Sequence, residues 1–96
     1  EVGAGVGGTA AVALAQVLSD LAGSHQVVCV THLPQVAVAG DAHFVVRKVA
    51  GADGVPETRI EEVDGEERVA EIARMLAGDE SEASLAHARE LLADRG

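Results

Sequence analysis

The stretch QVVCVTHLPQVA, residues 26–37, decides the fold class of this chain. Its first half, residues 26–31, is a short, continuous β-branched run, which is typical of a strand buried on both faces in a parallel sheet. Before it, residues 9–22 carry apolar side chains at the i, i+3, i+4, i+7 spacing of a helix, namely Leu14, Val17, Leu18 and Leu21. A helix that leads into a buried strand predicts an α/β fold.

The residues that follow predict a short helix and a hairpin. Pro34 suits the first turn of a helix that is closed by Gly40. Strands are expected over residues 42–50 and 57–63, because the GADGVP segment between them has turn chemistry.

Two helices are expected at the C-terminal end. One runs through residues 66–78, and the other starts after a cap at Asp79 or Ser81. Their apolar sides are Val69, Ile72, Ala73 and Leu76 in the first helix, and Leu85, Ala88 and Leu92 in the second.

The core that these elements can build is weak for a chain of 96 residues. Hydrophobic residues make up 48% of the chain, but 18 of them are Ala and 15 are Val, and Phe44 is the single aromatic residue. One buried strand and an acidic hairpin do not form a sheet that covers itself. We therefore expect residues 1–96 to be the C-terminal part of a larger α/β domain.

Charge and cysteine content indicate the cellular compartment and the kinds of partner to expect. The formal net charge is −9, of which −8 falls in residues 51–96 with their thirteen acidic and five basic side chains. Such a surface repels phosphate backbones, so DNA contact is not expected here. A single cysteine, Cys29, fits a reducing cytoplasm, and no apolar run approaches the roughly 18 residues of a membrane span. We expect a cytoplasmic protein without a membrane partner.

Two places could carry chemistry. His32 follows the expected buried strand and would therefore lie at the carboxyl end of a sheet, where α/β proteins place their ligands. Its imidazole could donate to a phosphate oxygen or act as an acid or base. The glycine-rich residues 3–8 formally match the dinucleotide fingerprint G-x-G-x-x-G, but the next strand lacks the acidic residue that binds ribose.

The remaining candidates are ordinary structural residues. His25, His43 and His87 are interpreted as surface or packing side chains, and Cys29 as a small core residue. No metal site is indicated by the sequence.

Several stretches together resemble the ATPase head of the ABC and SMC-like family of P-loop NTPases, and more narrowly a bacterial DNA repair member of it. They are EVGAGVGG at 1–8, VTHLPQVA at 30–37, DAHFVVRK at 41–48, EERVAEIARMLAG at 66–78 and HARELL at 87–92. The resemblance covers essentially the whole chain. It implies that the chain is the C-terminal fragment of such a head domain, with terminal helices.

The resemblance also implies roles for individual residues. Glu1 falls at the acidic residue that ends the Walker B motif and polarises the attacking water. Gly3, Ala4 and Gly5 fall in the D-loop, which meets the partner head across the bound ATP, although the family usually has Asp at the position of Gly3. His32 matches the switch histidine that senses the γ-phosphate.

What the resemblance implies for function is ATP hydrolysis with Mg²⁺ in recombinational repair of double-strand breaks. A second copy of the head would be the ATP-dependent partner, and DNA would be engaged by parts outside this chain. Because the chain contains no G-x-x-x-x-G-K-[ST] motif, we expect residues 1–96 by themselves neither to bind ATP tightly nor to hydrolyse it. The alternative is a non-catalytic α/β interaction module that retains an ATPase-like sequence.

Overall fold

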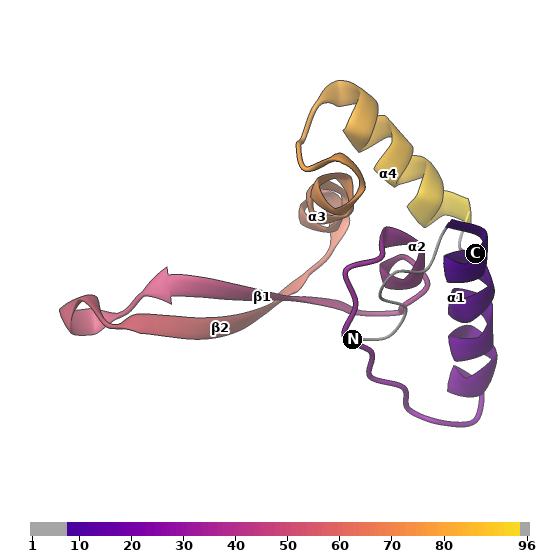
Figure 1. Cartoon of the computed structure of the whole chain (residues 1–96), viewed down its shortest axis with the longest axis horizontal. Coiled ribbons are helices and arrows are strands. Elements are labelled where there is room, and N and C mark those ends of the chain that lie inside the picture. Colours follow the sequence, from indigo (N-terminus) through magenta and orange to yellow (C-terminus); the bar gives the residue numbers. More distant parts are fainter. Residues whose placement is uncertain (1–7, 95–96) are drawn as a thin grey trace.

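The computed structural model describes residues 8–94, which form four α-helices and one hairpin (Figure 1). In chain order the elements are α1 (Gly8–Ala22), α2 (Pro34–Ala37), β1 (His43–Ala50), a 3₁₀ turn (Ala52–Gly54), β2 (Pro56–Val63), α3 (Gly65–Ala77) and α4 (Glu82–Asp94). The hairpin and the two terminal helices are confirmed, and so is a helix that ends just before Gly23.

The helix pair α3–α4 forms the best packed part of the molecule. Val69, Ile72 and Ala73 of α3 are buried, and they meet Ala88 of α4 and Val38 in one cluster. Leu76, Leu85 and Leu92 are partly buried against this cluster, so the predicted apolar sides of both helices are confirmed. Small side chains such as Ala73 and Ala88 allow the two helices to approach closely, but each removes little apolar area from water.

The ends of these helices follow the sequence signals. Asp64 occupies the N-cap position of α3, although its side chain makes no capping hydrogen bond, and Gly78 ends the helix in the left-handed conformation with φ +76°. Glycine is favoured there because it has no Cβ to clash with the preceding carbonyl. The Ser81 hydroxyl accepts a hydrogen bond from the Ser84 N–H in the first turn of α4, so Ser81 rather than Asp79 is the capping side chain.

The buried face of α1 differs from the one expected. Ala11 and Ala15 are the buried residues, and Leu14 and Leu18 lie half-buried beside them. Val17 is 61% exposed and Leu21 is also exposed, so the predicted stripe of Leu14, Val17, Leu18 and Leu21 is wrong in half of its members. The helix packs on α2 through its small residues, because these let the two backbones come closest.

The expected buried strand is not a strand in the structure. Residues 26–31 are extended but belong to no described sheet, and Val28 and Val30 are 87% and 74% exposed. Cys29 is half-buried rather than part of a core. The physical reason is the lack of neighbours: an extended segment becomes a strand only when another backbone satisfies its N–H and C=O groups, and none does so within residues 8–94.

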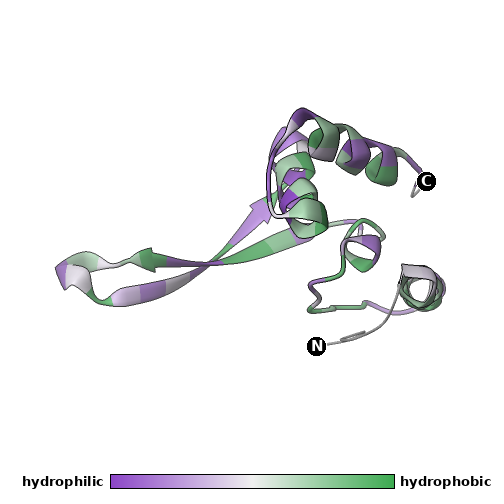
Figure 2. Ribbon diagram, turned by 45° about the horizontal axis from the view of Figure 1, so that its top comes forward, coloured by the Kyte–Doolittle hydropathy of each residue, from purple (hydrophilic) through white to green (hydrophobic). Residues whose placement is uncertain are grey.

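The hairpin extends away from the helices as a two-stranded ribbon (Figure 1). The strands are antiparallel, with His43 opposite Val63 and Val46 opposite Ile60. Of the sixteen strand positions only Val63, at the end next to α3, is buried. Phe44, Val46 and Ile60 are exposed together on the opposite face of the hairpin. Figure 2 shows apolar residues along this ribbon as well as on the helices.

The dimensions of the molecule follow from this ribbon. Its radius of gyration is 14.4 Å, with extents of 45 × 34 × 26 Å. A compact domain of this length would have a radius of about 12.5 Å. The excess comes from the hairpin, which extends away from the helices (Figure 1).

Candidate functional site

The His32 side chain lies on the loop between the extended residues 26–31 and helix α2, and it is exposed. The loop turns tightly, because the Leu33 N–H donates a 3.0 Å hydrogen bond to Oγ1 of Thr31. Such a turn satisfies a backbone donor that the start of a helix leaves open. The prediction that His32 lies at the carboxyl end of a buried strand is wrong for residues 8–94, because residues 26–31 pair with no other strand there. His32 instead lies on the loop before α2, with its side chain exposed.

Helix α2 begins two residues after His32. Pro34 occupies its first turn, and the N–H groups of Val36 and Ala37 both donate to the carbonyl oxygen of Leu33. Proline suits this position because its missing N–H would have no partner there in any case. Pro34 and Val36 are buried, which ties the helix to the body of the molecule.

The other end of α2 is held by a side chain from α3. Nη2 of Arg68 donates to the carbonyl oxygen of Ala37 at 3.1 Å and to that of Gly40 at 2.7 Å. These residues are 31 and 28 positions apart from Arg68 in the sequence. The last carbonyls of a helix lack partners within the helix, so a cationic donor is stabilising there. The His32 loop is therefore connected to the core of α3 through α2.

A wide cleft opens beside this loop. Its volume is about 1190 Å³, and it is lined by residues 25–32, by the side of α1 that carries Leu18, and by the start of β1. A cleft of this size exceeds the usual range of about 300–1,000 Å³ for ligand pockets. Most of the lining is apolar, and within residues 8–94 it includes no Lys or Arg. The cleft therefore has the character of an uncovered interior rather than of a nucleotide pocket.

His43 opens β1 next to the same cleft. Its Nδ1 is buried and has no hydrogen-bond partner in the described structure. Burial lowers the pKa of His43 below its ordinary value of 6.5, and the positive charge of Arg68 lowers that pKa further against a weaker opposing effect of Glu71. The packing role predicted for His43 is confirmed, but its altered titration was not predicted.

We expect the chain to lose stability as the pH falls below about 6.5, through His43. In this range the unfolded chain binds a proton at His43 that the folded chain binds only at lower pH, so the free energy of unfolding decreases with falling pH. Urea unfolding at pH 7.5 and pH 5.5 measures the difference. H43Q should reduce it, whereas H87Q, at an exposed histidine of α4, should leave it as in the wild type. An equal loss in H43Q and wild type would contradict this assignment.

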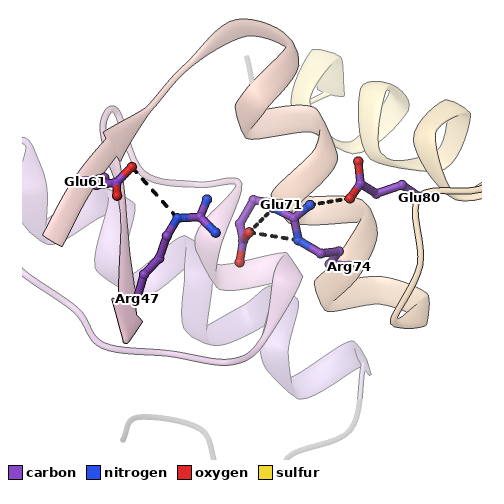
Figure 3. A network of polar contacts seen from close by, with 5 residues as sticks. All are labelled: Arg47, Glu61, Glu71, Arg74 and Glu80. Atoms are coloured by element: carbon purple, nitrogen blue, oxygen red, sulfur yellow. Dashed lines mark hydrogen bonds and ion pairs between the residues drawn. The ribbon is translucent and has the colours of Figure 1, made fainter. Parts of the chain in front are cut away.

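An ion-pair network fastens the turn between the last two helices. Figure 3 shows Arg74 of α3 between Glu71 and Glu80, with both carboxylates 2.5 Å away. The hydrogen bond to Glu71 is the main cause that raises the pKa of Arg74. Arg47 and Glu61, also drawn there, face each other across the hairpin at 3.9 Å. These contacts are structural, since they hold elements in place.

The other predicted site residues cannot be placed. Glu1, Gly3, Ala4 and Gly5 lie outside the described residues, so the structure tests no contact between them and His32. Among residues 8–94 there is no group of three or more His, Cys, Asp or Glu side chains able to hold a metal ion. No helix in that range is long and apolar enough to span a bilayer.

Sequence reasoning missed Arg68. Nothing in the spacing of residues 66–78 distinguishes Arg68 from the other charged residues on the polar side of α3. Its importance comes from the position of α2, which is close to α3 only in the folded chain.

Comparison with known proteins gives consistent matches over nearly the whole chain. The chain is 56% identical over 93 residues to the DNA repair protein RecN of Mycobacterium leprae, 52% identical to that of Deinococcus radiodurans and 45% identical to that of Vibrio cholerae. The matches cover 96%, 97% and 96% of this chain but only 15%, 16% and 17% of these relatives. The matched region is a C-terminal portion of the relatives. No protein-family model matches the chain.

Proposed function

Because the chain is a homologue of the C-terminal portion of the DNA repair protein RecN, we propose that it is part of an SMC-like ATPase head that acts in recombinational repair of double-strand breaks. The observation that carries this proposal is the identity of 45–56% over nearly the whole chain. The narrower resemblance seen in the sequence is confirmed by these relatives. ATP as substrate, the P-loop NTPase fold and action at the cytoplasmic nucleoid are parts of the proposal.

The geometry around His32 supports this assignment. The imidazole is exposed on a tightly turned loop directly after an extended segment, where a nitrogen could donate to a phosphate oxygen. The exposed Val28 and Val30 support the same view, because in a larger parallel sheet neighbouring strands would pair with the edges of residues 26–31 and helices would cover both faces.

In this proposal different residues of the chain have different roles in ATP hydrolysis. Glu1 accepts a proton from the attacking water, His32 donates to the γ-phosphate, and Gly3–Gly5 meet the second head. ATP supplies the phosphoryl group, and positioning and electrostatics provide most of the rate enhancement. The described residues of the cleft are not sufficient to bind the phosphates of ATP, because no Lys or Arg among them lines the cleft. The phosphates and Mg²⁺ would be held mainly by residues outside 8–94.

The experiment that tests the proposal uses a full-length RecN that carries residues 1–96 of this chain in the matching region. We expect wild type to form dimers transiently on addition of ATP and Mg²⁺. Glu1→Gln should make the dimer persist, because the neutral amide cannot accept the proton from water and ATP stays bound between the heads. Analytical size exclusion with light scattering measures the dimer fraction over time.

Glu57→Gln, at an exposed position of β2, serves as the matched control and should behave as wild type. A dimer that forms equally without ATP, or a Glu1→Gln variant indistinguishable from wild type, would count against the ATPase assignment. That result would favour the non-catalytic interaction module.

A further inference from the structure

We propose that Arg68 is a positioning residue for His32, acting through helix α2. The inference rests on the proposed function of His32 and adds a residue that lies 36 positions away in the sequence and on a different element. A series of contacts connects the two residues. The core side of α3 positions Arg68, Arg68 binds the end of α2, and the start of α2 holds the His32 loop.

The loop depends on α2 for its position. His32 is joined to α2 by Leu33 alone, and the Leu33 carbonyl oxygen accepts the first two hydrogen bonds of that helix, at 3.1 and 3.0 Å. The Leu33 N–H is bonded to Thr31 on the other side of the histidine. A rotation or shift of α2 would therefore move the backbone on both sides of His32.

Helix α2 cannot hold its position by itself. It has four residues, Pro34–Ala37, which is about one turn, and a single turn is unfavourable without tertiary support. The structure provides support of two kinds. Pro34, Val36 and the following Val38 are buried, and Arg68 binds the carbonyl oxygens of Ala37 and Gly40.

Arg68 is well placed to hold α2 in a fixed position relative to the core. It is half-buried on α3, next to Val69 and four positions before Ile72, and both of these belong to the main cluster. Its backbone N–H is bonded to Asp64 at the helix start. A guanidinium that donates to carbonyl oxygens forms charge-assisted bonds, which are stronger and more directional than neutral ones. A defined part of the core thus fixes the last residue of α2 and the turn that follows it.

The test is a double-mutant cycle in the full-length RecN that carries residues 1–96. Arg68→Ala should lower kcat for ATP hydrolysis by about 10- to 100-fold, because misplacing a catalytic group by about 1 Å has effects of this size. KM for ATP should change by less than about twofold, since the phosphates are held mainly elsewhere. In a His32→Ala background, Arg68→Ala should have no further effect on kcat, because there is no imidazole left to misplace.

Two further variants separate positioning from general stability. Arg89→Ala removes a guanidinium from an exposed ion pair with Glu66 on the helix pair and should leave kcat unchanged. Arg68→Lys keeps a charged donor with a different shape and should recover part of the lost activity. Where Arg68→Ala does not fold, as judged by thermal unfolding, the cycle is run with Arg68→Lys, and its smaller kcat loss should again vanish in the His32→Ala background.

If Arg68→Ala lowered kcat by the same factor in the wild-type and His32→Ala backgrounds, the proposal would be overturned, since Arg68 would then act independently of His32. A kcat unchanged in every Arg68 variant would overturn it as well. Failure of the underlying function gives a different result: His32→Ala would itself leave hydrolysis unchanged.

Discussion

Ile72→Ala is expected to lower the free energy of unfolding of the chain by about 3–4 kcal/mol, the middle of the range for deleting a fully buried isoleucine side chain down to its Cβ. Ile72 has an exposed fraction of 0% and is the largest side chain that is completely buried. Its neighbours include Val69 and Ala88, which are too small and too fixed on their helices to fill the space left behind. The loss would be a large fraction of the stability of a small domain.

The chain contains one matched control for this prediction. Ile60, the other isoleucine, is 69% exposed on the hairpin, so Ile60→Ala should cost less than about 0.5 kcal/mol. Urea unfolding followed by far-ultraviolet circular dichroism measures both. Similar losses for the two variants would mean that the α3–α4 cluster is not the main source of stability.

His32→Ala is expected to reduce kcat for ATP hydrolysis about 100-fold in a full-length RecN that carries these residues, the lower end of the effect of removing one donor that stabilises transition-state charge. The physical reason is that charge develops on the γ-phosphate oxygens as the bond to the leaving group breaks. A donor held in place by the Thr31–Leu33 turn loses no orientation freedom at that moment. Binding of ATP should be affected far less.

Steady-state hydrolysis and equilibrium binding of a fluorescent ATP analogue separate the two effects. His87→Ala, at an exposed position on α4, is the control and should keep wild-type kcat. A His32→Ala variant with normal kcat would show that the histidine has no part in hydrolysis. A variant with normal kcat but weak ATP binding would mean that His32 contributes to binding ATP and not to stabilising the transition state.

The elements with strong local signals were predictable from the sequence. The hairpin was marked by the turn chemistry of GADGVP between two strand-like segments, and β1 and β2 lie where expected. Helix α3 was predictable from the helical spacing of Val69, Ile72 and Ala73 and from Gly78 as its stop signal, which the left-handed φ of Gly78 confirms. In these cases the local preference and the tertiary packing favour the same structure.

The failures have one physical origin. Helical spacing cannot tell which of two apolar sides will be covered, and α1 has both a small-residue side with Ala11 and Ala15 and a larger-residue side with Val17 and Leu21. In the same way, the β-branched composition of residues 26–31 indicates an extended backbone but does not supply a pairing strand. Both features depend on tertiary contacts, which local sequence patterns do not specify.

The candidate site was predictable only in part. His32 was singled out because it follows an apolar run that was expected to be a buried strand, but the structure places it on an exposed loop after a segment that is not a strand. Its role in chemistry stays a prediction. Arg68 and His43 could not be found, since their roles depend on α2 and α3 being adjacent. Glu1 and the glycines stay predictions, because they lie outside the described residues.

The extended residues 26–31 also bear on how residues 1–96 alone behave in concentrated solution. An apolar segment that is not part of any described sheet, with Val28 and Val30 exposed, is a template for strand addition between molecules. The net charge of −9 keeps the molecules apart at low ionic strength, but added salt screens that repulsion and leaves the apolar attraction in place. Salt should therefore promote rather than dissolve self-association, the reverse of what is seen when ion pairs hold molecules together.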